Sequence, residues 1–230
     1  MRNNNQGNVA AIIVAAGSSQ RMDGVDKVFA PLAGRPVLAR VLDVCHRSNS
    51  IDRIVVVVSQ QNVTRCRQMV AVEKWSKVSQ VCAGGKRRQD SVQAGLKALG
   101  VCNWVVVHDG ARPFLTEKLI TDGLSAAQET GAAVAAVPVI DTIKLAGNDR
   151  MVRETIRRDN LWAAQTPQVF RFDIITEAYR RATDEVTDDA ALVEQMGYKV
   201  KLYMGAYDNV KITNPTDLAI AEVLWQKYGK

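Results

Sequence analysis

The sequence predicts an α/β protein in which an open, mostly parallel β-sheet is covered by helices on both faces. Three observations lead to this fold class. Apolar β-branched runs typical of buried parallel strands recur along the first part of the chain, most clearly at residues 51–59. Segments with helical periodicity separate these runs. The resulting βαβαβ alternation implies right-handed crossovers and a parallel sheet, and 230 residues suffice for one such domain.

The individual elements follow from local patterns. The β-branched run at residues 12–14 predicts the first strand, and a loop of small residues follows it. Residues 36–46 predict a helix, because apolar residues recur at i, i+3 and i+4 after an initial proline. Further strands are expected at 51–59, 78–82, 104–108 and 132–139, with helices at 61–75, 89–99 and 116–130.

After residue 139 the alternation stops. Residues 140–170 predict a hairpin that turns at 147–149 and then an extended return, which we interpret as a β-arm inserted into a single domain of residues 1–230. Its apolar side chains would be exposed unless another surface covered them, so we expect a homodimer with this segment as the dimerisation arm. The final elements are expected to be helices at 172–182 and 188–196, strands at 198–203 and 209–212, and a helix at 215–228.

The composition favours small anionic ligands over nucleic acid. The chain carries 30 Lys and Arg against 24 Asp and Glu, but the cations form short clusters and only 6% of residues are aromatic. We therefore expect no nucleic-acid partner. The four cysteines show no CxxC spacing, which indicates buried free thiols. The polar start of the chain and its short apolar runs predict a cytoplasmic protein without membrane contact.

The loop after the first strand is the strongest candidate binding site. Its small residues leave the backbone open to a ligand, and a glycine followed by serines lets successive N–H groups form an anion-binding nest. Two cations follow. The stretch lacks GxxxxGK[ST] and GxGxxG, so the usual nucleotide-binding motifs do not explain it. The alternative interpretation is an ordinary strand-to-helix turn with two solvated cations. The residues concerned are Ala15, Ala16, Gly17, Ser18, Arg21 and Lys27.

Two other segments are expected beside this loop. Gly84 and Gly85 follow the strand at 78–82, and Asp109 follows the strand at 104–108. Ligands of open, Rossmann-like sheets bind outside the carboxyl ends of the strands, so the sheet would bring all three segments to one rim. The alternative for the two glycines is a simple turn between strand and helix.

Seven motifs, taken in order, resemble the family of 2-C-methyl-D-erythritol 4-phosphate cytidylyltransferases over nearly the whole chain. They are AAGSSQRM with Lys27, GGKRRQDSV at 84–92, HDGARPF at 108–114, DTIK at 141–144, RRDNLWAAQTPQVF at 157–170, TDDA at 187–190 and NVKITNPTDL at 209–218. The resemblance implies a Rossmann-like nucleotidyltransferase that joins CTP and the polyol phosphate, releases diphosphate, uses Mg²⁺ and serves the non-mevalonate isoprenoid pathway.

The resemblance also implies roles for single residues. Arg21 and Lys27 would stabilise charge on the reacting phosphoryl group. The nucleotide would be bound by Ala15, Ala16, Gly17, Ser18, Gly84, Gly85, Arg88 and Ser91. The polyol phosphate would be bound by Asp109, Arg112, Thr142, Arg158 and Lys211. Asp109 could instead bind magnesium, and the sequence leaves both roles open.

Three positions depart from the family pattern. Asp26 stands where proline is common, Val28 where glutamine is common and Gly110 where alanine is common. The carboxylate of Asp26 could repel a triphosphate or help to hold a metal. We expect Gly110 only to loosen its turn, His108 to be structural and Arg157 to be a solvated arm residue.

Two other functions compete with this interpretation. One is a cytidylyltransferase for another polyol phosphate, such as ribitol 5-phosphate. The other is a non-catalytic protein that binds nucleotide or nucleic acid. The joint presence of five residues argues against it, namely Arg21, Lys27, Asp109, Arg158 and Lys211. With only His46 and His108 in the chain, no Ser/His/Asp set is available. None is needed, because a phosphate nucleophile is already ionised at neutral pH.

Overall fold

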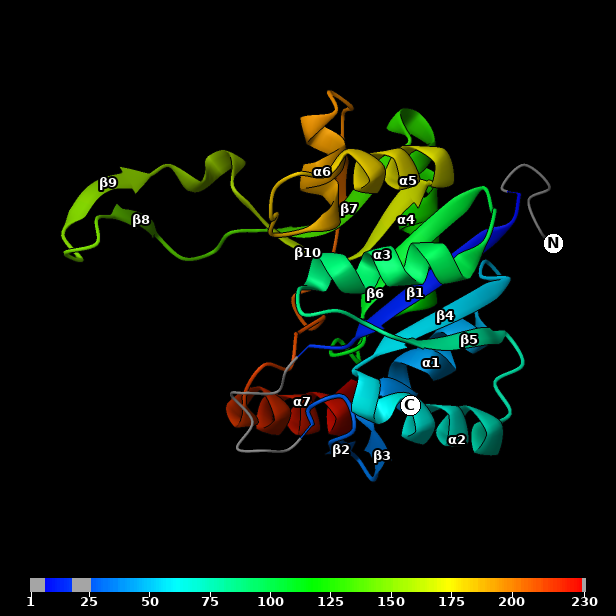
Figure 1. The fold of residues 1–230 in the computed structure, drawn as a ribbon. Coiled ribbons are helices and arrows are strands. Elements are labelled where there is room, and N and C mark those ends of the chain that lie inside the picture. The colour runs from blue at the N-terminus through cyan, green and yellow to red at the C-terminus, as the bar shows by residue number, and fades with distance from the viewer. Residues whose placement is uncertain (1–6, 18–25, 229–230) are drawn as a thin grey trace.

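A computed structural model describes residues 7–17 and 26–228 of the chain. Its central sheet has seven strands in the order β11-β7-β10-β6-β1-β4-β5 (Figure 1). Every neighbouring pair is parallel except those made by β10, which confirms the predicted open, mostly parallel sheet. The strands are β1 (Val9–Ala15), β4 (Arg53–Val58), β5 (Val78–Ala83), β6 (Trp104–Asp109), β7 (Ala132–Pro138), β10 (Trp162–Arg171) and β11 (Lys201–Met204).

Helices pack on both faces of the sheet, and β1 shows why. Successive strand residues point to opposite faces, so Ala11 and Ile13 join one buried cluster while Ala10 and Ile12 join another. A strand covered on both sides is therefore apolar throughout. The first cluster includes side chains of α1 (Val37–Arg47), α2 (Val63–Glu73) and α4 (Glu117–Thr130). The second includes side chains of α3 (Arg88–Leu99), α5 (Phe172–Arg181) and α6 (Asp189–Gln195).

The last helix, α7 (Pro215–Tyr228), lies beside the short hairpin of β2 (Pro31–Leu32) and β3 (Arg35–Pro36) (Figure 1). A third apolar cluster joins them. The strand predicted at 209–212 is wrong, because these residues belong to no sheet. The N–H of Ile212 instead donates to the carbonyl of Ala111 at 2.9 Å, which ties this segment to the chain just after β6.

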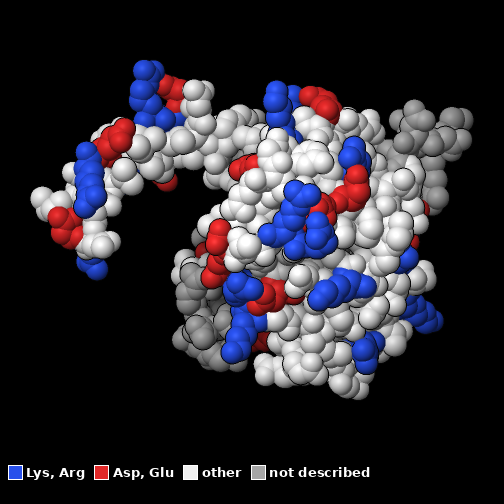
Figure 2. Space-filling model, turned by 45° about the horizontal axis from the view of Figure 1, so that its top comes forward, with Lys and Arg blue, Asp and Glu red and all other residues white. Residues whose placement is uncertain are grey.

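The predicted hairpin is present and protrudes from the body (Figures 1 and 2). It consists of β8 (Ile143–Ala146) and β9 (Val152–Ile156), and its turn is closed by the N–H of Arg150 donating to the carbonyl of Gly147 at 2.9 Å. The arm is shorter than the predicted 140–170. Residues 162–171 form β10 instead, because apolar side chains such as Phe170 are buried in the core between β6 and β7.

Surface and thiol chemistry complete the description of the body. Within the described ranges, no helix is long enough and apolar enough to cross a bilayer. Figure 2 shows Lys and Arg on the visible face in small groups with Asp and Glu between them, which is unlike one continuous basic surface. Cys45, Cys66 and Cys102 are buried free thiols, and Cys82 is partly buried. Burial raises the pKa of the Cys45 thiol to about 12.

Candidate functional site

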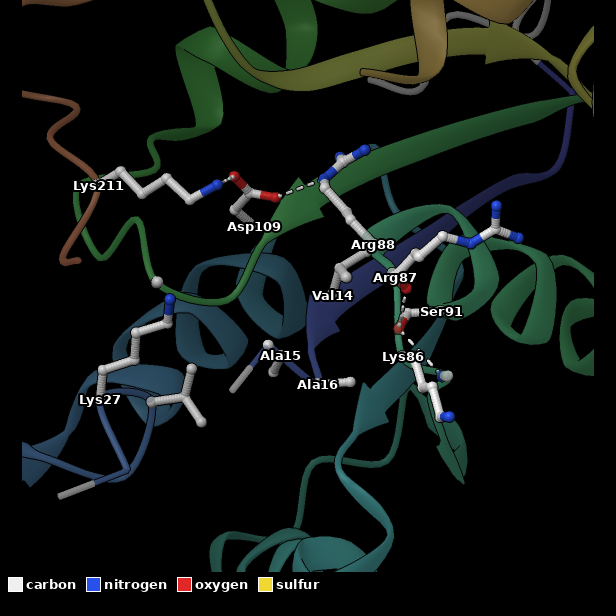
Figure 3. Close-up of a pocket in the computed structure, with 14 residues that line it drawn as sticks. Val14, Ala15, Ala16, Lys27, Lys86, Arg87, Arg88, Ser91, Asp109 and Lys211 are labelled. Atoms are coloured by element: carbon white, nitrogen blue, oxygen red, sulfur yellow. Dashed lines mark hydrogen bonds and ion pairs between the residues drawn. The ribbon is translucent and has the colours of Figure 1, made fainter. Parts of the chain in front are cut away.

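A pocket that is open to solvent lies at the carboxyl ends of the central parallel strands (Figure 3). The parallel strands bring together segments that are far apart in the sequence, as the sheet geometry predicts. The pocket is lined by Val14, Ala15, Ala16, Gly17, Lys27, Val28, Gly85, Lys86, Arg87, Arg88, Ser91, Asp109, Ala111 and Lys211. Of the predicted site residues, Ser18 and Arg21 lie outside the described part of the chain.

Close backbone approach forms one wall of this pocket. A Cβ added to Gly84 would lie 2.4 Å from the Cβ of Ala16 and 2.5 Å from the Oγ of Ser91. Only glycine therefore lets the end of β5 fit between β1 and α3. The N–H of Gly85 donates to the Ser91 hydroxyl at 3.2 Å, and this hydroxyl donates to the Arg87 carbonyl at 3.2 Å. Gly84 does not itself line the pocket but supports the residues that do.

Lys27 reaches the pocket from the opposite side (Figure 3). Its Nζ lies 3.8 Å from the position of a Cβ built on Gly17. Asp26 holds the turn that carries this lysine, because one carboxylate oxygen accepts from the Val28 N–H at 3.2 Å and the other accepts from the side-chain amide of Asn62. Asp26 is not among the residues lining the pocket, so its carboxylate serves the turn.

Gly110 is tightly packed, which corrects the expectation that it only loosens its turn. A Cβ at this position would lie 2.9 Å from the Cβ of Ala15 and 3.1 Å from a methyl carbon of Leu38. The Gly110 N–H donates to the carbonyl of Val14 at 2.8 Å. The missing side chain lets the end of β6 approach the end of β1.

Asp109 is the centre of a buried ion-pair cluster. Its Oδ1 accepts from Arg88 Nε at 3.2 Å, its Oδ2 lies 2.7 Å from Lys211 Nζ, and Arg112 Nε lies 3.8 Å from the same oxygen. Its side chain is only 8% exposed. Burial opposes its ionisation, but Arg88, Lys211 and Arg112 outweigh this effect and hold the pKa of Asp109 well below its usual range. The carboxylate is therefore ionised at neutral pH.

Arg112 and Lys211 approach Asp109 from different segments. The Arg112 guanidinium also donates to the carbonyl of Asn209 at 2.6 Å, which links the β6 end to the segment before α7. Arg112 does not line the pocket, whereas Lys211 does. Asn209 is not among the predicted site residues, although it is the first residue of the NVKITNPTDL motif.

His108 is fully buried and is linked to the backbone of Asp109 through the Thr166 hydroxyl. Its Nε2 donates to the carbonyl of Arg112 at 3.1 Å, since a carbonyl can only accept, and the Thr166 hydroxyl therefore donates to Nδ1 at 3.0 Å. The Asp109 N–H donates to the same hydroxyl oxygen at 3.1 Å. Burial lowers the pKa of His108 to about 4. The ring is thus neutral, in agreement with the structural role expected.

Thr142 and Arg158 lie on the exposed arm and do not line the pocket of their own chain. The Arg158 guanidinium donates to the carbonyl of Ile140, at the base of the arm. Its neighbour Arg157 pairs with Asp159 at 2.8 Å, and 91% of its side chain is exposed, as expected of a solvated residue.

The described residues do not fit a magnesium ion bound by the protein alone. Asp109 is the carboxylate among the pocket-lining residues, and both of its oxygens already face cations. Across the ranges that the structure describes, no group of three or more His, Cys, Asp or Glu could hold a metal. Magnesium in nucleotide sites is often bound by one or two carboxylates together with substrate phosphates.

Sequence reasoning missed several residues of the site. Lys86 and Arg87 line the pocket, although only Arg88 of this basic cluster was assigned to it. Asp189, from the TDDA motif, forms an ion pair with Arg88 at 2.8 Å. These positions lie inside motifs that the sequence made visible, but nothing in the sequence distinguished a side chain in the pocket from one behind it.

Comparison with known proteins identifies the family. The family model for IspD, 2-C-methyl-D-erythritol 4-phosphate cytidylyltransferase, matches residues 9–227. A relative of that name from Dehalococcoides mccartyi is 52% identical over 219 residues, covering 95% of this chain and 96% of the relative. One from Caldanaerobacter subterraneus is 44% identical, covering 96% and 100%.

Solved structures agree. The 4-diphosphocytidyl-2C-methyl-D-erythritol synthase of Anaerococcus prevotii superposes with a TM-score of 0.85 at 32% identity, covering 96% of this chain and 100% of that one. The cytidylyltransferase of Thermus thermophilus gives 0.77 at 31% identity, covering 94% and 98%. The chain therefore belongs to the 2-C-methyl-D-erythritol 4-phosphate cytidylyltransferase family.

Proposed function

We propose that this chain joins CTP and 2-C-methyl-D-erythritol 4-phosphate to give 4-diphosphocytidyl-2-C-methyl-D-erythritol and diphosphate, in isoprenoid precursor synthesis. Family membership and the names of the relatives support this reaction. The observation that carries it is one pocket that combines small residues near β1 and α3 with Lys27 on one side and the Asp109 cluster on the other.

The reaction needs positioning and charge neutralisation more than proton transfer. A phosphate oxygen of the polyol phosphate forms a bond to the α-phosphorus of CTP, while the bond from that phosphorus to the bridging oxygen of diphosphate breaks. The nucleophile is already ionised, so no general base is required. His108 is neutral, buried and bonded on both ring nitrogens, which agrees with a mechanism without a histidine base.

The pocket divides into two subsites. Close approach of the backbone near Ala16, Gly85 and Ser91 suits the edge of a pyrimidine, while Lys27 stabilises the reacting phosphoryl group and the leaving diphosphate. We assign the same role to Arg21, which lies outside the described residues. Asp109 and Lys211 bind the polyol phosphate. Since cations hold the Asp109 carboxylate from two sides, a substrate hydroxyl is a better partner for it than a metal ion.

Magnesium enters this proposal with the triphosphate of CTP rather than at a preformed protein site. A divalent ion there supplies charge neutralisation for the phosphates. We expect EDTA to abolish diphosphate release and added Mg²⁺ to restore it. We also expect isothermal titration of Mg²⁺ into the nucleotide-free protein to give no tight binding. Activity that survives complete chelation would contradict a metal requirement.

The arm supports a homodimer. The apolar side chains of Ile140, Met151 and Val152 are 63%, 67% and 58% exposed in the single chain. A second copy is the natural cover for them, since an isologous contact buries both arms at once. In such a dimer Thr142 and Arg158 complete the partner's pocket and bind its polyol phosphate.

Steady-state diphosphate release tests the proposed reaction. CTP should be used in preference to ATP and GTP. The backbone lies close to the base in a pocket of small residues, and this close approach leaves little room for a purine. 2-C-methyl-D-erythritol 4-phosphate should be preferred to ribitol 5-phosphate. Equal use of ATP would contradict the nucleotide assignment, and faster turnover of ribitol 5-phosphate would contradict the substrate assignment.

A further inference from the structure

The guanidinium of Arg88 connects the pocket to a buried carboxylate behind it. Arg88 begins α3, and its Nε donates to Oδ1 of Asp109 at 3.2 Å. Its Nη2 lies 2.8 Å from Oδ2 of Asp189, the first residue of α6. One cation thus bridges two carboxylates that come from different elements, of which only Asp109 lines the pocket.

Asp189 is an unusual residue for such a position. Its side chain is 1% exposed, and a buried carboxylate is costly unless it is paired and hydrogen-bonded. The Tyr179 hydroxyl donates to Oδ1 at 2.5 Å, and Arg88 lies at Oδ2. Burial and the nearby Asp189 raise the pKa of Tyr179, so its hydroxyl stays protonated as a donor. One oxygen of Asp189 thus accepts a hydrogen bond from Tyr179, and the other lies at ion-pair distance from Arg88 without a hydrogen bond.

The neighbouring residue, Asp188, anchors the start of α6 to the sheet. Asp188 caps α6, since its Oδ1 accepts from the Ala191 N–H at 3.1 Å. Its Oδ2 accepts from the Gln168 side chain at 2.8 Å, and the carbonyl oxygen of that side chain accepts from the Ala190 N–H at 3.2 Å. The anchoring of α6 to β10 thus runs through Asp188 and Gln168. Asp189 instead faces Tyr179 of α5 and Arg88.

We propose that Asp189 is a positioning residue of the active site, which holds Arg88 so that Arg88 fixes Asp109 for the polyol phosphate. The charge count around Asp109 gives the physical reason. Three cations, Arg88, Lys211 and Arg112, surround this single carboxylate. Asp189 draws the Arg88 guanidinium to a second carboxylate, so that Asp109 keeps one oxygen oriented by Arg88 and the other by Lys211.

The inference rests on the proposed function, and the assay is diphosphate release at saturating CTP with varied 2-C-methyl-D-erythritol 4-phosphate. Asp189→Asn preserves shape and removes the charge. We expect kcat/KM for the polyol phosphate to fall by about 10²-fold, the size of effect that a misplacement of about 1 Å produces. The matched control is Asp188→Asn, which should lower thermal stability but retain kcat/KM at a temperature where it is folded. An active wild type with an unaffected Asp189→Asn variant overturns the positioning role alone, whereas an inactive wild type contradicts the function.

A double-mutant cycle separates positioning from a merely structural role. In an Arg88→Met background, Asp189→Asn should leave kcat/KM unchanged, because Asp189 acts through Arg88. In that background the same change should raise the midpoint of thermal unfolding, since it removes an unpaired buried charge. An equal loss of kcat/KM in both backgrounds would overturn the proposal.

A milder variant covers the case in which Asp189→Asn does not fold. Tyr179→Phe keeps the ring and the Arg88–Asp189 pair but removes the donor at Oδ1. We expect a several-fold fall in kcat/KM for the polyol phosphate with the fold retained by circular dichroism. A folded Tyr179→Phe enzyme with wild-type kcat/KM would count against the proposal.

Discussion

At the scale of single residues, environment decides which ionisable groups can act. Asp109 and His108 are adjacent and both buried, yet one is ionised and the other neutral. The difference lies in their partners. Asp109 faces the cations of Arg88, Lys211 and Arg112, whereas His108 contacts a carbonyl and a hydroxyl. Lys27 lines the same pocket from its other side (Figure 3).

Lys27→Ala should lower turnover by about 10²–10³-fold, because it removes a donor that stabilises charge in the transition state. The fold should be retained, since the side chain lines a solvent-open pocket. Diphosphate release and the circular-dichroism melting curve measure the two effects. Lys118→Ala, which changes an exposed lysine on α4, is the control and should remain active. Near-normal turnover of Lys27→Ala would refute the assigned role.

His108 should make stability depend on pH. Its folded pKa of about 4 lies below the ordinary value of 6.5, so between these values the unfolded chain binds more protons than the folded one. Stability therefore falls as pH is lowered through this window, by about 3 kcal/mol at about 1.4 kcal/mol per pH unit. In His108→Gln this part of the fall should be absent. Urea unfolding at several pH values gives the comparison, and parallel pH dependences for the two proteins would contradict it.

At the scale of elements, small residues set how closely β1 is approached by β5, β6 and α3. Gly84 fits between Ala16 and Ser91, and Gly110 fits against Ala15. The loops at the pocket thus depend on packing between strand ends. A larger side chain at one of these glycines acts on the pocket without touching the ligand.

Gly84→Ala should therefore both destabilise the protein and weaken nucleotide binding. The added methyl group would have to push Ala16 or Ser91 away, and such overpacking costs about 1–3 kcal/mol. We expect a lower midpoint of urea unfolding together with a higher KM for CTP. If the variant unfolds like the wild type and keeps its KM, the close approach is not needed for the pocket.

At the scale of the whole molecule, the arm is the feature whose predicted role is not fulfilled within a single chain. It projects away from the body, and the site residues it carries do not line the pocket of their own chain (Figure 1). In the proposed two-fold dimer each arm would lie across the partner's rim, so that Arg158 would act in trans.

Mixing Lys27→Ala with Arg158→Ala should therefore restore activity. A mixed dimer has one site that carries both lesions and one that carries neither. At random pairing about half of the dimers are mixed, so roughly a quarter of wild-type activity should return. Diphosphate release after subunit exchange is the measurement. Arg157→Ala is the matched control for the arm and should be active by itself. A mixture that has exchanged subunits but stays as inactive as its components shows that the arm serves its own subunit.

The sequence by itself determined the fold class, the order of most elements and the segments that form the pocket. Apolar runs such as that of β4 predict strands covered on both faces. Loops that follow parallel strands lie at the same edge of the sheet, whatever the details of packing. The hairpin turn at Gly147 was equally visible, because turn residues act locally.

Only the tertiary structure decided the rest. The segment 162–171 extends from the arm in sequence but pairs between β6 and β7 in space, and the segment 209–212 looks like a strand but pairs with no sheet. Local pattern cannot report such pairing, since it depends on which edges are free in the assembled sheet. The Arg88 bridge from Asp109 to Asp189 could not be predicted for the same reason. The sequence shows the charged residues, but the packing of α3, α6 and β6 decides which of them pair.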